Sequence, residues 1–249
     1  MFENPRRPPK EKVIWRYLSI DKYLDLITTQ TIKFTQVDIA ADQLEISLML
    51  NRLEKSGSLD GNKDILSSAR QFINTLRKSH YISCWTGKEH ECRSLWFSYL
   101  GESRLGVAVK TTVSKFIENI DWEESGYDYN EVIYRDSFNE PEELQSNTLL
   151  LNSKALAYSS ESEIRFSTNK SLIELPEGDL SATNPPIHVD IDSLPKIICF
   201  DANLELMIDE VWLSPYCQEW QLEMFKTVTK QLAPFLADKI RRSDVDERI

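Results

Sequence analysis

The stretch VIWRYLSIDKYLDLITTQTIKFTQ, residues 13–36, determines how the fold begins. Residues 13–19 are rich in β-branched and aromatic side chains, which is typical of a β-strand. Residues 21–30 start with a candidate capping residue, and their apolar side chains recur at helical spacing. Residues 31–36 alternate apolar and polar side chains, which predicts a second strand. The chain therefore opens as a strand, a short helix and a strand.

The rest of the sequence mixes helical and extended patterns without a regular order. Further helices are expected over 38–55, 65–78, 91–101, 140–156 and 217–236, and further strands over 80–86, 104–112, 131–136, 163–167, 187–191, 196–200 and 208–214. Strand–helix–strand units do not recur regularly, which disfavours a doubly wound parallel sheet. We therefore expect an α+β fold with a mixed, mainly antiparallel sheet core flanked by helices.

The sequence shows neither an internal repeat nor a linker that would divide it into domains. Residues 1–12 contain three prolines and several basic side chains, and we expect them to form a disordered arm. Residues 238–249 are mostly polar and are expected to form a tail. The remainder, residues 13–237, is expected to form a single α+β domain.

Composition disfavours several functional classes. The 249 residues include 29 Lys and Arg against 40 Asp and Glu, which gives a formal net charge of -11. Proteins that bind nucleic acid by neutralising phosphates usually have the opposite balance. There are only 7 glycines, and neither GxGxxG nor GxxxxGK[ST] occurs. A Rossmann dinucleotide fingerprint and a P-loop are therefore absent.

The sequence also bears on the compartment and on metals. No apolar run approaches the ~20 residues that a membrane span requires, and the N-terminus lacks the apolar core of a secretory signal. Cys84, Cys92, Cys199 and Cys217 form no CxxC pair, which is typical of free thiols in a reducing cytosol. We therefore expect a cytoplasmic protein without membrane association. Cys84, His90 and Cys92 match no standard zinc spacing, so no metal is expected.

Polar side chains stand out in three of the predicted strands. Arg16 lies between two aromatic residues of the first strand, and Ser83 lies in the ISCW segment. Glu161 and Glu163 stand at the start of the EIRF strand. Alternation would place Glu161, Glu163 and Arg165 on one strand face. A solvated strand face would explain any one of these residues, but their combination indicates a site.

Four blocks of the sequence carry a family resemblance. They are IWRYLSIDKYLDLITTQTIKF, ISCWTGKEHECRSLWFSYLGESRLGVAVKTT, EVIYRD and SKALAYSSESEIRF, which lie within residues 13–168. The most specific positions are Glu91, Trp96, Tyr99, Gly106, Lys154, Glu161, Glu163 and Arg165. In this order the blocks resemble the bacterial family catalogued as domain of unknown function 2971. The resemblance implies a bacterial protein from a context of mobile elements, toxin systems or phage defence.

The order of the polar motifs is also similar to that of ADP-ribosyltransferases of the Arg–Ser–Glu type. This resemblance implies an ADP-ribosyltransferase-like fold, with NAD as the substrate and a protein or a nucleic acid as the acceptor. Glu163 would stabilise the positive charge on the ribose oxocarbenium ion, and Ser83 would support Glu163. Glu161 would orient or deprotonate the acceptor.

The same resemblance implies residues that bind NAD. Arg16 would hold the pyrophosphate with its forked N–H donors. Tyr17 or Trp85 would stack on the nicotinamide ring. These roles require no glycine-rich phosphate loop, which agrees with the low glycine content.

A non-catalytic interaction or regulatory module, for example an antitoxin, is an open alternative. Arg16 and the carboxylates would then form a structural ion network. The helix over 217–236 would place Trp220, Met224, Val228 and Leu232 in one stripe. Trp220, Met224 and Phe225 of this helix would form a surface for a partner or for a homo-oligomer.

A metal-dependent nuclease that uses Asp42, Glu45 and Glu91 is a third hypothesis. The three hypotheses predict different geometries. An enzyme requires Arg16, Ser83 and Glu163 to converge on one cleft. An ion network would pair Arg16 directly with a glutamate and leave no open volume. The sequence by itself leaves open whether the chain is an enzyme.

Overall fold

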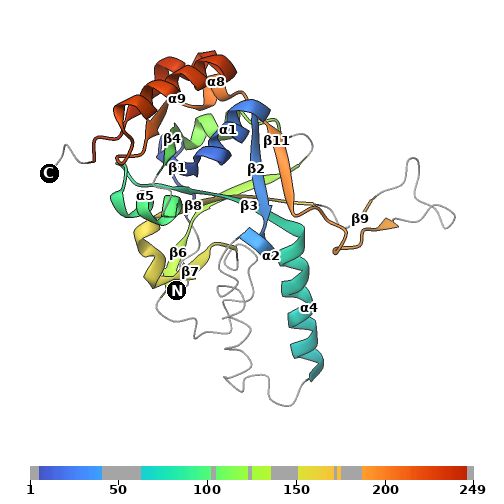
Figure 1. Cartoon of the computed structure of the whole chain (residues 1–249). Helices are drawn as coiled ribbons and strands as arrows, with labels where there is room; N and C mark the ends of the chain where they lie inside the picture. The colour runs from blue at the N-terminus through green and yellow to red at the C-terminus, as the bar shows by residue number, and fades with distance from the viewer. Residues whose placement is uncertain are drawn as a thin grey trace.

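The computed structural model describes residues 6–40, 63–101, 105–122, 125–135, 151–170, 173–174 and 187–245. These residues form a nine-stranded sheet, two separate strand pairs and surrounding helices (Figure 1). The strands are β1 (Val13–Ser19), β2 (Thr31–Gln36), β3 (His80–Thr86), β4 (Gly106–Thr112), β5 (Tyr127–Glu131), β6 (Ile133–Arg135), β7 (Ser153–Ala155), β8 (Glu163–Asn169), β9 (Ile173–Glu174), β10 (Ile187–His188), β11 (Ile197–Asp201), β12 (Glu210–Leu213) and β13 (Ile240–Arg242).

Helices cover the sheet and extend from its ends. They are α1 (Ile20–Thr29), α2 (Val37–Ala40), α4 (Lys63–Ser79), α5 (Arg93–Leu100), α6 (Val113–Glu118), α8 (Leu204–Met207) and α9 (Glu219–Leu232), with 3₁₀ helices at η3 (Leu156–Glu161) and η4 (Pro234–Lys239). Figure 1 shows α8 and α9 together at one end of the molecule, whereas α4 extends away at the other end. None of the helices in the described ranges is long and apolar enough to cross a membrane.

The sheet is mainly antiparallel, and the expected α+β class is confirmed. Among the described strands, only β12 with β13 and β6 with β7 pair in parallel, and the second pair lies outside the nine-stranded sheet. The opening strand, helix and strand occur as predicted, as β1, α1 and β2. Gln30 ends α1 in the left-handed region, with φ at 52°, and its N–H donates to the carbonyl oxygen of Leu26. This tight end turns the chain directly into β2.

β3 is the branch point of the sheet. Along one edge it pairs with β8 over its whole length, from His80 opposite Asn169 to Thr86 opposite Glu163. On its other edge β2 pairs only with the beginning of β3, and β1 pairs only with its last residue. No strand in the described part of the chain pairs with residues 83–85 on that edge. The sheet therefore splits beside the middle of β3.

Alternation along β1 connects two apolar clusters. Ile14 and Leu18 belong to the main core, which includes α1, β4 and the inner face of α9. Trp15 and Tyr17 belong to a smaller cluster that forms under α5. Arg16 shares its strand face with Ile14 and Leu18. A charged side chain is thus directed toward the core side of the sheet, where the strands split.

Both ends of the expected domain extend further than predicted. In the expected arm, the carbonyl oxygen of Arg6 accepts from the Glu131 N–H, and that of Lys12 accepts from the Val113 N–H. The described residues 6–12 are therefore held against the body. In the expected tail, residues 240–242 form β13, which adds a strand to the sheet.

Two predicted helices lie mostly outside the described residues. Of the helix expected over 38–55, the structure describes only the part that falls in α2. Of the helix expected over 140–156, residue 151 is helical, and β7 and the start of η3 follow it. The change from helix to strand follows from tertiary pairing, because residues 153–155 pair with β6.

Candidate functional site

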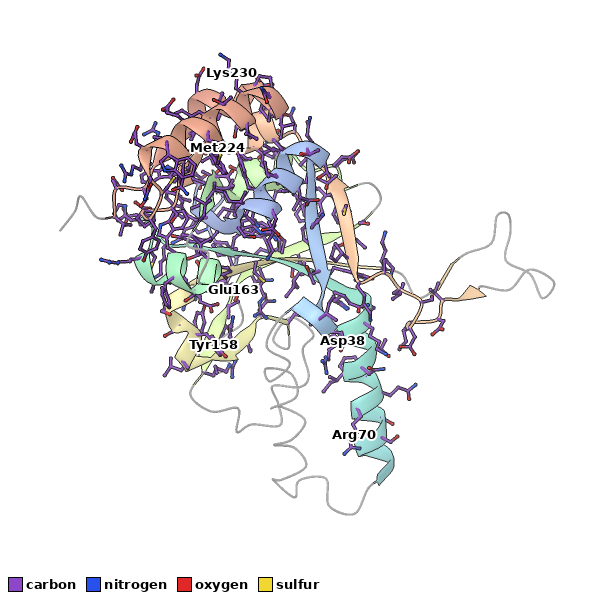
Figure 2. All side chains as sticks on the ribbon, in the orientation of Figure 1. Asp38, Arg70, Tyr158, Glu163, Met224 and Lys230 are labelled. Carbon is purple, nitrogen blue, oxygen red and sulfur yellow. The ribbon has the colours of Figure 1, made fainter. Side chains whose placement is uncertain are left out.

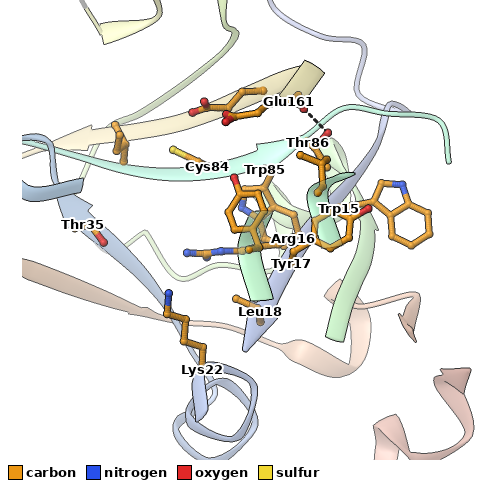
Figure 3. Close-up of a pocket in the computed structure, with 14 residues that line it drawn as sticks. Trp15, Arg16, Tyr17, Leu18, Lys22, Thr35, Cys84, Trp85, Thr86 and Glu161 are labelled. Carbon is orange, nitrogen blue, oxygen red and sulfur yellow. Dashed lines mark hydrogen bonds between the residues drawn. The ribbon is translucent and has the colours of Figure 1, made fainter. Parts of the chain in front are cut away.

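A pocket of about 210 Å³ opens where β1 and β3 separate (Figure 3). Five of the predicted site residues line it: Arg16, Tyr17, Trp85, Glu161 and Glu163. The sixth, Ser83, contacts Arg16 through its hydroxyl group. The structure thus brings together residues that lie as far apart in the sequence as the first strand and β8.

Arg16 reaches into the pocket from β1, between Cys84 and Lys22 (Figure 3). Its Nη1 donates to the Ser83 hydroxyl at 3.0 Å, and its guanidinium lies over the Trp85 ring, 5.7 Å from the centroid. Burial lowers the pKa of Arg16, but an arginine remains charged at physiological pH. No carboxylate in the described residues forms an ion pair with it. An anionic ligand would supply the missing counter-charge.

Ser83 orients Arg16 rather than Glu163. Its Oγ accepts from Arg16 and also from the Trp85 Nε1, at 3.1 Å. In the register of β3 and β8, Ser83 lies opposite Phe166, so it does not face the carboxylate. The expected support of Glu163 by Ser83 is therefore wrong, because strand alternation directs the hydroxyl to the Arg16 side.

Glu163 is held by two cations at the inner end of the pocket. Its Oε1 accepts from the Arg165 Nε at 2.6 Å, and its Oε2 accepts from the Lys154 Nζ at 3.1 Å. The side chain is only 4% exposed. Burial raises the pKa of Glu163, but the charges of Arg165 and Lys154 outweigh burial and lower the pKa to about 2. The carboxylate is therefore ionised at physiological pH.

Glu161 is more open to the pocket than Glu163. Its Oε2 accepts from the Lys154 Nζ at 2.8 Å, and its side chain is 22% exposed. It ends η3 and does not belong to β8, because Ser162 takes a left-handed conformation with φ at 47°. The Thr86 Oγ1 donates to the Glu161 carbonyl oxygen at 2.5 Å and holds this turn (Figure 3). The prediction of one strand face thus holds for Glu163 and Arg165 only.

Cys84 lies between the arginine and the carboxylates, and we did not predict a role for it. It is opposite Arg165 in the strand register, on the strand face that also carries Glu163, and it lies close enough to influence the pKa of that carboxylate. Burial raises the pKa of Cys84, so the thiol stays protonated. A protonated thiol can donate to the carboxylate but is a poor nucleophile.

Tyr99 is a second pocket residue for which we did not predict a role in the site. Its ring stacks on Tyr17, with centroids 5.9 Å apart, and remains 50% exposed. Tyr17 is buried, and its hydroxyl accepts from the Cys92 N–H at 2.8 Å. The three-residue spacing of Trp96 and Tyr99 on α5 indicates one helix face. In the structure Trp96 fills the core, whereas Tyr99 reaches the pocket rim.

Trp85 is less accessible than expected for a stacking residue. Its ring is buried, Arg16 lies over one face of it, and Phe116 packs against it at 4.9 Å between centroids. Trp85 therefore supports the guanidinium, and Tyr99 is the aromatic ring that offers an open surface to a ligand.

The pocket continues into a second hollow of about 400 Å³ between α1, β1 and β2. Arg16, Lys22 and Trp85 line both parts, so Arg16 lies at their junction. Lys22 is exposed and, like Arg16, has no ion pair within the described residues. Lys33 and Asp25 form an ion pair of 2.6 Å at the outer part. We call the two parts together the groove.

The nuclease hypothesis receives no geometric support. Asp42 and Glu45 lie outside the described residues. Glu91 lies away from the groove, where its carboxylate accepts from Trp96, Ser243 and the Asp244 N–H. The described ranges contain no group of three or more His, Cys, Asp or Glu residues that could hold a metal ion.

Comparisons of the chain with family models, with curated proteins and with solved structures found no match. The two family resemblances therefore stay predictions.

Proposed function

We propose that the groove binds NAD and that the chain is an ADP-ribosyltransferase-like enzyme. The observation that carries this proposal is the guanidinium of Arg16, which lines the junction of the groove without a carboxylate partner. One part of the groove contains two carboxylates, and the other part is large enough to add a second ligand moiety. A dinucleotide matches this arrangement, because its central pyrophosphate would lie at Arg16, one ribose would lie near the carboxylates, and the other nucleoside would occupy the second part.

Arg16 is suited to a pyrophosphate by chemistry and by orientation. A guanidinium has five N–H donors in a planar fork, and the described residues engage only Nη1. The Ser83 hydroxyl and the Trp85 ring hold it in place, so little side-chain freedom is lost on binding. Lys22 adds a second positive charge beside it. Paired phosphate oxygens would accept charge-assisted hydrogen bonds from both side chains.

The carboxylates would act on the ribose. The bond between nicotinamide and the ribose C1′ breaks, its electron pair leaves with nicotinamide, and C1′ becomes positively charged. Glu163, fixed as an anion, stabilises that charge. The nucleophile of a protein or nucleic-acid acceptor, or a water molecule, forms a bond to C1′. Its proton passes to Glu161, the more exposed carboxylate.

Labelled NAD tests this proposal directly. Purified chain is titrated with NAD by calorimetry, and nicotinamide release is followed with and without cell lysate as a source of acceptors. We expect binding and release by the wild type, loss of binding in Arg16→Gln, and loss of release in Glu163→Gln. Arg241→Gln on β13, away from the groove, is the matched surface control. A folded wild-type protein that neither binds nor cleaves NAD would refute the proposal.

The non-catalytic module remains the second candidate, because the carboxylates do form a buried ion network with Lys154 and Arg165. Arg16 is not a member of this network, which separates the two hypotheses. In a structural network, Glu163→Gln would lower stability without removing any turnover, and Arg16→Gln would change no ligand binding. In the enzyme, Arg16→Gln weakens NAD binding at least about 10-fold while the fold is retained.

A further inference from the structure

The outward face of α9 carries apolar side chains that contact solvent. Trp220 is 62% exposed and Met224 is 43% exposed. The predicted stripe through these residues therefore lies outside the core. The inner face consists of Leu222, Phe225 and Thr229, so the predicted role of Phe225 in a partner surface is wrong.

The inner face packs against α1 and η4. Tyr23 of α1 stacks on Phe225, with centroids 5.2 Å apart, and its hydroxyl shares a hydrogen bond of 3.1 Å with Thr229. Successive residues of a helix are rotated by about 100°. Trp220, Met224 and Thr227 therefore lie on the opposite side from Phe225 and Thr229.

Charged residues lie along one flank of this outward face, with the acidic residues before the basic residues. Glu219 and Glu223 come first along the helix, and Lys226 and Lys230 follow. The helical rotation places all four on the same flank. Figure 2 shows Met224 and Lys230 on α9, with Lys230 at the outer edge of the molecule. The flank is thus negative in its first half and positive in its second half.

This order is complementary to itself when the helix direction is reversed. A two-fold rotation places the same flank of two antiparallel helices side by side, with the sequence running in opposite directions. With the axis between residues 224 and 225, Glu219 faces Lys230 of the second copy, and Glu223 faces Lys226. Met224 then lies close to its own copy, and Trp220 lies against Val228 of the second copy.

Existing ion pairs on this flank do not oppose such pairing. Lys226 contacts Glu223 at 3.1 Å, and Arg242 contacts Glu219 at 3.6 Å. These side chains are 41% to 73% exposed, and exposed pairs contribute little to stability. Replacing these ion pairs by ion pairs between the two copies would therefore change the stability little.

We infer that the chain forms a homodimer through antiparallel packing of two copies of α9. Apolar contact of Trp220 and Met224 supplies the attraction, and the charged flank selects the antiparallel direction. No residue of α9 lines the groove, so this inference is independent of the proposed function.

Charge reversal on the flank tests the dimer. One variant, Glu219→Lys with Glu223→Lys, makes the flank wholly positive, and the other, Lys226→Glu with Lys230→Glu, makes it wholly negative. Light scattering during gel filtration should give the wild type twice the 28.9 kDa of the chain. Each variant alone should be monomeric, because like charges then face each other. An equimolar mixture, with one variant mass-tagged, should form a dimer containing one copy of each.

Recovery of the dimer in the mixture shows that both variants are folded, and circular dichroism checks each one alone. A wild type that stays monomeric at all soluble concentrations would overturn the inference. Variants that remain dimeric on their own would also overturn it, because the dimer would then use another surface.

Discussion

At the scale of single residues, Arg16 is unusual because its charge lacks a charged partner among the described residues. It carries a charge among apolar neighbours and has a hydroxyl and an aromatic ring as its protein partners. Withdrawing a charge from water without a counter-charge lowers stability. Such a residue is consistent with a binding role, because the ligand supplies the interaction that the protein lacks.

Arg16→Met should therefore separate stability from binding. The variant retains an apolar stem but removes the unpaired charge, so we expect the free energy of unfolding to stay equal or rise by about 1 kcal/mol. The variant also loses the hydrogen bonds from the guanidinium to the pyrophosphate, which contribute about 1.5–3 kcal/mol. We therefore expect NAD binding to weaken about 10- to 100-fold. Urea unfolding and calorimetry measure the two effects. A variant that unfolds more easily and binds NAD as before would contradict this assignment.

Glu163 should make stability depend on pH in the acid range. Its pKa lies at about 2 in the folded chain against 4.5 for an unperturbed glutamate. Because the pKa of Glu163 is lowered in the folded chain, the ionised carboxylate stabilises the fold above pH 4.5. This contribution is lost as the pH falls toward 2. The loss is on the order of 3 kcal/mol. Urea unfolding between pH 6 and about 3 should show it.

The matched comparison for this pH dependence is Glu163→Gln, which has no titrating group at this position. Its unfolding free energy should be lower at pH 6, because Arg165 and Lys154 lose a charged partner. The slope of its stability against pH should be smaller than that of the wild type. Identical slopes would show that other carboxylates determine the acid sensitivity.

At the scale of elements, the site depends on how β1 is placed between β3 and β4. β1 pairs with β4 along its whole length, from Val13 opposite Thr112 to Ser19 opposite Gly106, but meets β3 at one residue. The complete pairing on one edge holds Arg16 in register. The open edge on the other side leaves space for the groove.

Gly106→Ala should weaken this element. A Cβ at Gly106 would overlap the carbonyl oxygen of Leu18 and the side chain of Leu100, so β1 or α5 would have to move. We expect the free energy of unfolding to fall by about 1–3 kcal/mol. Gly126→Ala is the control, because nothing lies within 4 Å of the added Cβ. Thermal unfolding compares the two, and equal melting temperatures would contradict the close approach.

At the scale of the whole molecule, the C-terminal segment forms an edge strand of the sheet that carries Arg16. β13 pairs with β12, which in turn pairs with β4. Beyond β13, the Ser243 Oγ donates to the Glu91 carboxylate at 2.7 Å and the Asp244 N–H donates to it at 3.0 Å. The segment therefore ties the sheet to the start of α5.

Truncation after residue 239 should destabilise the molecule. It removes the buried Ile240 and the partners of Glu91, and burial of one such side chain is worth about 1.5–3 kcal/mol. We expect a loss of at least about 2 kcal/mol in urea unfolding. Truncation after residue 245 keeps β13 and serves as the control. Equal stability of the two truncated chains would show that β13 contributes nothing.

The local pattern of the sequence predicted most elements and singled out several residues that line the pocket. The alternation and periodicity in β1, α1, β2 and β3 depend on neighbours within a few residues, and these elements occur where they were predicted. Arg16, Glu161 and Glu163 were recognisable because charged residues are unusual in such apolar strands. They do line one pocket.

Tertiary structure alone decided which of these residues touch one another. The branching of the sheet at β3 creates the groove. Strand alternation directs Ser83 toward Arg16 and places Cys84 on the strand face of Glu163 and Arg165. The position of α1 decides which face of α9 is buried, and it leaves Trp220 outside. Periodicity identifies the faces of an element but contains no information about what packs against each face. That choice depends on contacts between segments far apart in the chain.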